Sequence, residues 1–428
     1  MYLKLVSTKN ANIKSTIKKA ILNPSINNNG LWSFLKINKM SKNYFNELPN
    51  KDFNEIALDI SKNVGLDNEI KEEKLKQIID KSFNFPIINR KISTNLSMCE
   101  LYHGPSKSFK DIGTIFTANL IEEFNDNKKL HIITATTGDT GSAVASAFYK
   151  KNNIKVHILY PKDKISKIQR KQMTTLGNNI KCYEVDGNFD DCQIIVKKLL
   201  KNVENSTTCN SINIGRIIAQ TFYYFYTCKD HLDKKINFSI PTGNLGNGLS
   251  CYIAKQMGLP INDIIYACNH NSNLNYYLDN KDKKTTSVKT LANAIDIIEP
   301  SNYERLLYFI NNYKKNNDID YLFTTQTNDK EIMYMINNMY YKFDLIIDPH
   351  TAVAFDSLFY KYVNYERFNK KYHNIIMSTA DPIKFYNEID YTNKLVIPYD
   401  IKEILKKEEY IIKCKNNYDD VKSNILKN

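Results

Sequence analysis

The chain lacks the segments that would place it in a membrane or outside the cell. It contains no apolar run of membrane-spanning length, and its first residues have neither the apolar stretch nor the small-residue cleavage site of a secretory signal. We therefore expect no membrane contact and a cytoplasmic location. The cysteines include no CxxC pair, and this scatter favours reduced thiols over disulfides or a zinc knuckle. We accordingly expect no metal. The eight cysteines are Cys99, Cys182, Cys192, Cys209, Cys228, Cys251, Cys268 and Cys414.

Arginine is the other scarce residue. Only five of the 59 basic residues are arginine, although the net charge is +13. Lysine, asparagine and isoleucine are used heavily throughout, as a strongly AT-biased genome would produce. The basic residues form no arginine-rich arm and accompany no aromatic stripe, so we expect no nucleic-acid partner. Where lysine is so common, each arginine is more strongly expected to serve through its planar guanidinium. The five are Arg90, Arg170, Arg216, Arg305 and Arg367.

Length and pattern predict an α/β protein with two αβ domains. A chain of 428 residues with 42% hydrophobic residues exceeds what one small core needs. Residues 1–95 are mainly helical in pattern and are expected to form an N-terminal subdomain. Residues 96–235 and 236–428 then alternate strands with helices. The sequence does not decide between a monomer and a homodimer.

Several segments show how the sheets should be built. A strand at Leu130–Thr137, a helix after it and a strand at Ile154–Pro161 form a βαβ unit, which implies parallel strands. A further strand should end at Pro241, with a helix at Gly248–Met257. Two later apolar segments, residues 344–348 and 374–378, are each expected to be a strand that leads into a turn and a helix.

The segment HGPSKSFKD, residues 103–111, carries a candidate Schiff-base lysine. A lysine amine is protonated near neutral pH, so it attacks a carbonyl well only where burial or a nearby cation lowers its pKa. Phe109 and the apolar run 115–120 could bury Lys110. The alternative is an ordinary surface lysine, since most lysines of this chain should be solvated.

Two glycine-containing loops have the components of anion sites. In Gly243–Gly248 the backbone N–H groups can converge at the start of a helix, which suits a phosphate. Thr136–Ser142 offers hydroxyls and N–H groups that could hold a carboxylate. The alternatives are an ordinary strand-to-helix turn for the first, and a helix N-cap by Asp139 or Thr140 for the second. Together with Lys110, the loops suggest pyridoxal phosphate (PLP) bound to an amino acid.

In their order and their residues, these segments resemble those of the threonine synthases, members of the tryptophan synthase β-like family of PLP enzymes with fold type II. HGPSKSFKD is similar to HGPTxAFKD of that family, TTGDTGSA to SGDTGSA, and SINIGRIIAQ to SINxxRxxxQ. PTGNLGNGLSCYIAKQMGLP is similar to PTGNFGDxxAGxxAKxMGLP. TLANAIDIIEPSN, DPHTAVAF and STADPIKF match later motifs in the same order. The resemblance covers nearly the whole chain and implies two open twisted αβ domains with PLP in the cleft between them.

The resemblance also implies a set of cofactor contacts. Lys110 would hold PLP as a Schiff base and then act as general acid and base. Thr379 would hydrogen-bond the pyridine nitrogen, and a neutral hydroxyl there would leave that nitrogen unprotonated. Asp139 would lie near the ring hydroxyl. The cofactor phosphate would be held by backbone N–H groups of Gly243, Asn244, Leu245, Gly246 and Asn247.

The implied activity is threonine synthase, a PLP-dependent lyase of threonine biosynthesis that converts O-phospho-L-homoserine and water to L-threonine and phosphate. The route would be γ-elimination of phosphate followed by β-addition of water. The substrate carboxylate would bind Thr136, Thr137 and Thr140. The substrate phosphate would bind Arg216 in bidentate fashion, with help from Ser211 and Asn213. Further candidates for substrate contact are Ser106 and Lys107.

The chain departs from the family pattern at one chemically important position. Where the family has TAHP, this chain has an acid, Asp381, so a role carried by that histidine is in doubt. We interpret His350 as structural or supporting rather than catalytic, and His103 as equally suited to packing and to cofactor contact. A threonine or serine dehydratase is the main alternative, but its lysine motif usually continues to arginine and glycine, unlike Asp111 here. A non-catalytic relative of the same fold is the other.

Overall fold

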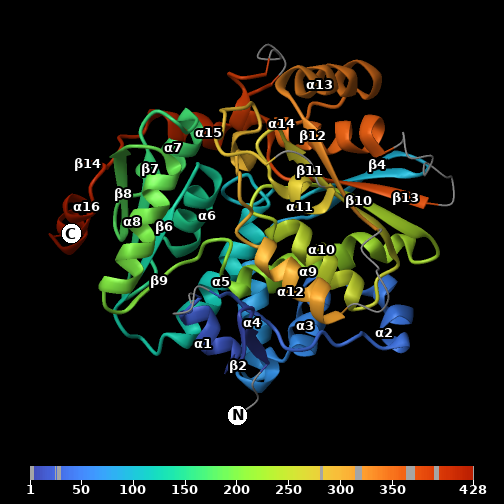
Figure 1. Ribbon diagram of the computed structural model, residues 1–428, viewed down its shortest axis with the longest axis horizontal. Coiled ribbons are helices and arrows are strands. Elements are labelled where there is room, and N and C mark those ends of the chain that lie inside the picture. The colour runs from blue at the N-terminus through green and yellow to red at the C-terminus, as the bar shows by residue number, and fades with distance from the viewer. Residues whose placement is uncertain are drawn as a thin grey trace.

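Two mainly parallel sheets, each flanked by helices, form the body of the molecule, and a smaller N-terminal part lies against them (Figure 1). The computed structural model describes residues 4–24, 26, 30–279, 283–313, 321–362, 372–389 and 395–427. The α/β fold predicted from the sequence is confirmed.

The N-terminal part contains helices, as expected, and also a small antiparallel sheet that the sequence reading did not predict. Helix α3 begins at a capping box of Asp52 and Glu55 and ends at Gly65, whose φ of +96° closes the helix. It packs against α9 of the body. The strands are β1 (Leu5–Ser7), β2 (Asn10–Ser15) and β3 (Trp32–Phe34), and the helices are α1 (Ile17–Leu22), α2 (Lys42–Glu47), α3 (Phe53–Val64) and α4 (Glu72–Ser82).

The first sheet of the body has five strands, all parallel, in the order β14-β8-β7-β6-β9. Side chains alternate between its two faces. Ile133 and Ala135 face α8 and α16, whereas Ile132 packs with Val144 of α6 on the other face. Its strands are β6 (Leu130–Ala135), β7 (Ile154–Pro161), β8 (Ile180–Asp186), β9 (Ser206–Thr207) and β14 (Ile411–Lys415), and its helices are α5 (Lys110–Phe124), α6 (Asp139–Phe148), α7 (Lys167–Thr174), α8 (Phe189–Asn202) and α16 (Tyr418–Lys427).

The second sheet has six strands in the order β12-β11-β10-β13-β5-β4, and only the edge pair β4–β5 is antiparallel. Helix α14 covers one face, and α9 and α10 cover the other. The strands are β4 (Ile88–Ser93), β5 (Leu96–Glu100), β10 (Lys235–Pro241), β11 (Ile261–Asn269), β12 (Leu322–Thr327) and β13 (Tyr372–Ser378), and the helices are α9 (Ile214–Cys228), α10 (Gly246–Gln256), α11 (Leu274–Asp279), α12 (Tyr303–Tyr313), α13 (Asp329–Phe343) and α14 (Pro349–Asp356). Helix α15 (Tyr399–Lys406) packs against α7 of the first sheet.

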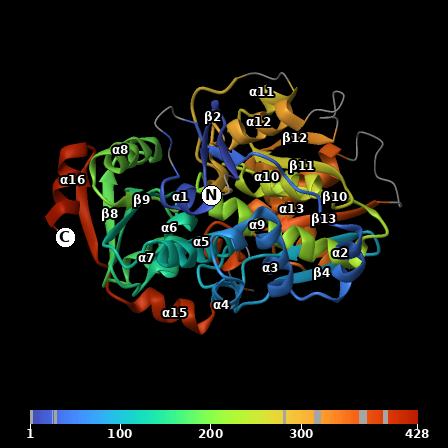
Figure 2. The ribbon, with the colours of Figure 1, turned by 90° about the horizontal axis from the view of Figure 1, so that it is seen from below.

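The sheets exchange strands along the chain. Strand β5 pairs with β13 in the six-stranded sheet, whereas the next strand along the chain, β6, belongs to the five-stranded sheet. Strand β14 pairs with β8, so the chain returns to the first sheet at its C-terminal end, beside α8 in Figure 2. The domain boundaries at residues 95 and 235 stay a prediction. The structure adds that the chain passes between the two sheets after β5 and again before β14.

One predicted strand is wrong. Residues 344–348 follow α13 as irregular chain and pair with no described strand. Asp344 adopts a left-handed conformation with φ of +50°, and its N–H bonds back to the carbonyl of Tyr340. The N–H of Leu345 bonds to the carbonyl of Met339. These bonds close the helix, so the apolar run serves as its C-terminal connection.

The largest core cluster lies between the two sheets and the N-terminal part. Helix α9 is buried on nearly all sides within it, and most of its residues are apolar or aromatic. Helices α5 and α10 both pack against α9. The starts of α5, α9 and α10 are thereby held at fixed positions relative to one another, and these starts carry most of the candidate site residues.

Candidate active site

The lysine-bearing loop is bound to the segment that follows β13. The N–H of Phe109 donates to the carbonyl of Thr379 at 2.9 Å, and Ser108 and Ala380 form an antiparallel bridge. Lys110 is the first residue of α5. The structure therefore brings together Lys110 and Thr379, which the sequence proposed as the two ends of one cofactor site.

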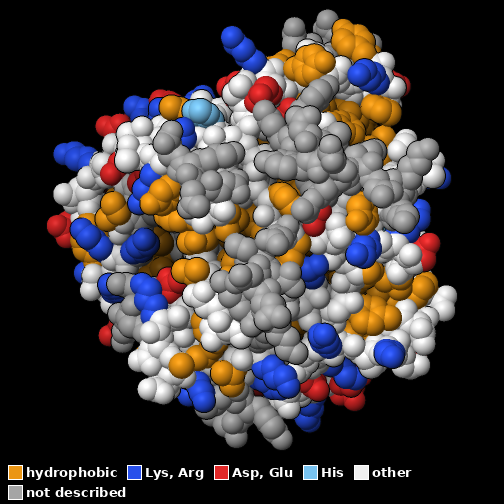
Figure 3. Space-filling model, turned by 45° about the vertical axis from the view of Figure 1, so that its right-hand side comes forward, with side chains coloured by type: hydrophobic (Ala, Val, Ile, Leu, Met, Phe, Trp, Pro, Cys, Tyr) orange, Lys and Arg blue, Asp and Glu red, His pale blue; other side chains and the backbone are white. Residues whose placement is uncertain are grey.

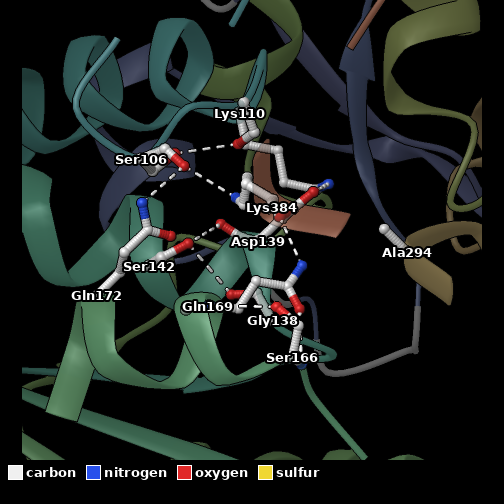
Figure 4. A network of polar contacts seen from close by, with 12 residues as sticks. Ser106, Lys110, Gly138, Asp139, Ser142, Ser166, Gln169, Gln172, Ala294 and Lys384 are labelled. Atoms are coloured by element: carbon white, nitrogen blue, oxygen red, sulfur yellow. Dashed lines mark hydrogen bonds and ion pairs between the residues drawn. The ribbon is translucent and has the colours of Figure 1, made fainter. Parts of the chain in front are cut away.

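The side chain of Lys110 lies in a buried, charged setting (Figure 4). Its Nζ donates to Oδ2 of Asp139 at 3.1 Å and lies 4.9 Å from the ring centre of Phe109. Burial lowers the pKa of Lys110, and the charges of Lys384 and Arg216 lower it further, while Asp139 acts in the opposite direction. An amine with a lowered pKa next to a carboxylate is suited to carbonyl attack and to proton transfer.

Asp139 is the centre of a hydrogen-bond network at the start of α6. Its Oδ1 accepts from Nε2 of Gln169 at 2.8 Å and from Nζ of Lys384 at 2.5 Å, and its Oδ2 accepts from Lys110. Burial alone raises the pKa of Asp139, but the charges of Lys110 and Lys384 outweigh it and hold the pKa well below the usual range. Asp139 is therefore an ionised carboxylate between two lysines.

The threonine loop before α6 is folded around a hydroxyl. Oγ1 of Thr136 accepts from the N–H of Gly138 at 2.9 Å and from the N–H of Gly141 at 2.7 Å. Gly138 has a φ of +129°, and a Cβ there would collide with Gln169. Thr136 is buried, whereas Thr137 and Thr140 are partly exposed. Thr136 thus holds the loop in shape, and the other two threonines present their side chains at its accessible side.

The glycine loop between β10 and α10 is shaped by two unusual positions. Leu245 has a φ of +62°, which turns the chain into α10 at Gly246. A Cβ on Gly243 would lie 3.0 Å from the Cα of Ile295, so a larger residue there would require the backbone to shift. The first amides of a helix have no acceptor inside the helix. Gly246 and Asn247 therefore offer N–H groups at this point.

Asn247 is held by two tyrosines. Its Oδ1 accepts from Tyr223 at 2.6 Å and from Tyr224 at 2.5 Å. Its buried Nδ2 has no hydrogen-bond partner. Burial raises the pKa of both tyrosines, so they stay neutral donors. The amide thus keeps one unused donor at the start of α10.

The loop is joined to the start of α9 through residues 301 and 302. Asn244 accepts through Oδ1 from the N–H of Ser301 and through its carbonyl from Nδ2 of Asn302, at 3.3 and 3.0 Å. Nδ2 of Asn302 also donates to the carbonyl of Ser211 at 3.2 Å, and the hydroxyls of Ser211 and Ser301 lie 3.0 Å apart. The segments predicted to bind two different phosphates are therefore directly connected.

Arg216 is buried in the first turn of α9. Nη1 donates to the carbonyl of Cys209 at 3.1 Å, and Nε has no hydrogen-bond partner. Among the described residues, no carboxylate forms an ion pair with this guanidinium. Burial lowers the pKa of Arg216. A buried cation with an unused donor indicates a place for an anion.

Asn213 serves as the N-cap of α9. Its Oδ1 accepts from the N–H of Gly215 at 3.0 Å, and its Nδ2 donates to the carbonyls of Ile21 and Thr208 at 2.9 and 3.0 Å. Its side chain thus fixes the start of the helix that carries Arg216. A direct contact with substrate phosphate stays a prediction.

Ser106 and Lys107 differ in their surroundings. Ser106 is buried: its N–H donates to Oδ2 of Asp111 at 2.8 Å, and its hydroxyl lies 3.0 Å from that of Ser108. Nζ of Lys107 lies 3.8 Å from Oδ2 of Asp381 and 3.5 Å from Oδ2 of Asp400. The acid that replaces the family histidine therefore faces a lysine.

The two histidines are both paired with acids. Nε2 of His350 accepts from the N–H of Ala294 at 3.1 Å, so its Nδ1, 2.8 Å from Asp348, carries the proton. Nε2 of His103 lies 2.9 Å from Glu100. These contacts support a structural interpretation of His350.

Sequence reasoning missed Lys384 and Gln169, which both bond to Asp139. Lys384 lies in the segment STADPIKF, within a short 3-10 helix at Pro382–Phe385, and the motif was the only signal that could have pointed to it. Gln169 had no such signal, because it reaches Asp139 from α7 only in the folded chain.

Comparisons with known proteins identify the family. Residues 88–379 match the family of pyridoxal-phosphate dependent enzymes, and residues 4–83 match the threonine synthase N terminus. Threonine synthase of Buchnera aphidicola subsp. Acyrthosiphon pisum is 35% identical over 350 residues, which cover 78% of this chain and 79% of that protein. Threonine synthase of Escherichia coli is 32% identical over 399 residues, which cover 91% and 90%.

Solved structures give the same result. The crystal structure of threonine synthase from Escherichia coli superposes with a TM-score of 0.91 at 29% identity and covers 99% of this chain and 100% of that chain. A PLP-bound threonine synthase from Brucella melitensis gives a TM-score of 0.86 at 25% identity, with 99% of each chain covered. The chain belongs to the threonine synthase family of pyridoxal-phosphate dependent lyases with fold type II.

Proposed function

We propose that this chain converts O-phospho-L-homoserine and water to L-threonine and phosphate, with PLP bound to Lys110. The observation that carries the proposal is the buried Lys110 amine, 3.1 Å from Asp139, together with the buried Arg216, which has no carboxylate partner among the described residues. The first group suits a carbonyl cofactor, and the second suits a phosphate.

The residues present fit this cofactor. Asn247 has an unused buried Nδ2, and the close approach of Gly243 to Ile295 fixes the backbone whose N–H groups lead into α10. A helix start with converging N–H groups favours a phosphate. We assign the cofactor phosphate to Gly243–Asn247, the pyridine nitrogen to Thr379, and the side of the ring hydroxyl to Asp139.

PLP supplies the electron sink that stabilises carbanions on the substrate, and this chain supplies orientation and proton transfer. Once the substrate amine has displaced it from the cofactor, Nζ of Lys110 would take a proton from Cα of the substrate and later return a proton to the substrate. Asp139 stays ionised and holds Nζ in place. Phe109 covers the amine and reduces its contact with water.

The substrate ends are assigned to two loops. The partly exposed Thr137 and Thr140, held by Thr136, bind the carboxylate at the start of α6. Arg216 binds the leaving phosphate with Nε and a second guanidinium nitrogen, and Ser211 follows two residues after Cys209, whose carbonyl accepts from Nη1 of Arg216. Ser106 and Lys107 remain candidates at the edge of this region, and Asn213 supports the start of α9.

We also propose where the chain acts and how it assembles. The chain acts on a small molecule, and no described helix is long and apolar enough to cross a membrane. All eight cysteines are buried thiols, which supports our proposal of a cytoplasmic location. On the face that Figure 3 shows, lysine and arginine side chains are scattered rather than gathered in one patch. We propose a monomer or a homodimer, which the elution volume in size-exclusion chromatography with light scattering would distinguish.

The experiment is an assay of the purified chain with PLP. We expect phosphate release from O-phospho-L-homoserine with formation of an equal amount of threonine. A visible absorbance band that borohydride abolishes should accompany the bound cofactor. Deamination of threonine to an oxo acid, without turnover of phosphohomoserine, would instead assign the chain to the dehydratases. A bound cofactor with neither reaction would favour a non-catalytic relative.

A further inference from the structure

Lys384 is a second buried lysine at the site. It follows β13 in the short helix Pro382–Phe385, and its side chain is completely buried. Its Nζ donates to Oδ1 of Asp139 at 2.5 Å and to the carbonyl of Ser106 at 2.8 Å. Figure 4 shows that it lies between the loop of Lys110 and the start of α6. Lys384 thus connects three segments that are far apart in the sequence.

Two ammonium groups share one carboxylate here. The charged groups that act on Lys110 are Asp139 from α6, Lys384 after β13 and Arg216 from α9. With both lysines protonated, the three cations Lys110, Lys384 and Arg216 outnumber the two buried carboxylates Asp139 and Asp111. Burial and like charge both favour the loss of one proton.

The hydrogen bonds decide which lysine loses its proton. Lys384 donates to two acceptors, within 2.8 Å, and has no exposed surface. Lys110 donates to one acceptor at 3.1 Å, and its side chain is 14% exposed. A neutral amine is the weaker donor, so deprotonation weakens two short bonds at Lys384 but only one longer bond at Lys110. The proton therefore leaves Lys110.

We infer that Lys384 is a positioning residue that remains charged, neutralises Asp139 and so leaves Nζ of Lys110 available as a neutral amine. The inference rests on the proposed role of Lys110 as the cofactor lysine. It assigns to Lys384 no contact with substrate. Its consequence is that the protonation of Lys110 depends on a residue about 270 positions away in the sequence.

The test measures the protonation of Lys110 in the full chain stripped of cofactor. Competitive acetylation across a pH series, read by mass spectrometry of the Lys110 peptide, gives the pH of half-labelling. Lys384→Met keeps the length of the side chain and removes its charge, so Asp139 acts on Lys110 alone. We expect the half-labelling pH of Lys110 to rise by about one unit, a tenfold loss of neutral amine at a fixed pH below it. Lys384→Arg should retain the wild-type half-labelling pH within about 0.3 unit, a twofold change in neutral amine.

Lys151→Met is the matched control, because Lys151 is also a largely buried lysine bound to a carboxylate, Glu122, but belongs to no candidate site segment. It should leave the titration of Lys110 unchanged. An unchanged or lower half-labelling pH in Lys384→Met would overturn the inference. If that variant does not fold, Lys384→Gln, which also removes the charge, is measured in the same way: an unchanged or lower half-labelling pH of Lys110 would overturn the inference.

The rate at which added PLP develops its visible absorbance provides a second measurement. In Lys384→Met the pH profile of this rate should shift upward with the labelling curve. Both measurements are made without substrate. A chain that binds PLP but does not turn over phosphohomoserine would therefore contradict the proposed function and leave this inference testable.

Discussion

The starts of α6 and α10 differ in the kind of group that they offer to a ligand. At α6 the chain buries charges: Asp139 lies between Lys110 and Lys384. At α10 it uses neutral groups, since Asn247 is held by two tyrosines and the loop offers backbone N–H groups. Moving a proton requires a group whose pKa depends on its neighbours, whereas holding a phosphate requires donors that do not titrate. Changes near α6 should therefore depend on pH, and changes near α10 should not.

The largest effect should come from removal of the reacting amine. Lys110→Ala should lower kcat by at least about 10³-fold, because both cofactor attachment and proton transfer lose their group. The borohydride-sensitive absorbance should disappear with it. Lys151→Met serves as the control and should keep both. Retained absorbance in Lys110→Ala would assign the cofactor to another lysine.

Arg216→Lys tests the cation at the start of α9. A lysine cannot reproduce a bidentate guanidinium, so kcat/KM for phosphohomoserine should fall by about 100-fold. Bound PLP should keep its absorbance, because its phosphate is assigned to the loop of α10. Steady-state kinetics and absorbance together check this result. Equal turnover and apparent affinity in the variant would remove Arg216 from the phosphate site.

Asp111→Asn tests whether buried charge near the lysine costs stability. Burial raises the pKa of Asp111 from 3.8 to about 6. The unfolded chain therefore releases this proton first as pH rises, and the folded state loses stability between about pH 4 and 6. Asparagine avoids this loss, but its amide would replace an oxygen that has no partner. We expect a gain of about 1–2 kcal/mol above pH 6 that shrinks toward pH 4.

Urea unfolding at pH 4.5 and pH 7.5 measures this difference. A gain of equal size at both values would show that Asp111 is not the titrating group. Asn247→Ala, at the neutral start of α10, is the matched comparison. Its effect on stability should be the same at both pH values.

The smallest effect should come from the glycine loop. A Cβ on Gly243 would lie 3.0 Å from the Cα of Ile295, so Gly243→Ala requires a backbone shift of a few tenths of an ångström. We expect PLP affinity to fall by about tenfold, independently of pH. Absorbance titration at two pH values checks this. A pH-dependent loss would contradict the contrast between the two helix starts.

The sequence predicted much of this site because its signals are local. The βαβ unit from Leu130 to Pro161 is confirmed, because strand and helix periodicity follow directly from side-chain pattern. The expected strand at residues 344–348 failed because an apolar run can equally close a helix, and Asp344 did so with a left-handed turn. Strand β14 was also beyond sequence reasoning, because its partner β8 lies more than 200 residues away.

The sequence by itself determined the family, the candidate lysine and the two loops. Motifs and glycine-dependent turns depend only on residues that are adjacent in the sequence. Only the tertiary structure decided how these parts act on one another. It placed Lys384 and Gln169 on Asp139, left Arg216 buried without a carboxylate partner among the described residues, and paired Asp381 with Lys107. A pKa depends on burial and on charges a few ångströms away in space, and neither quantity can be obtained from spacing along the chain.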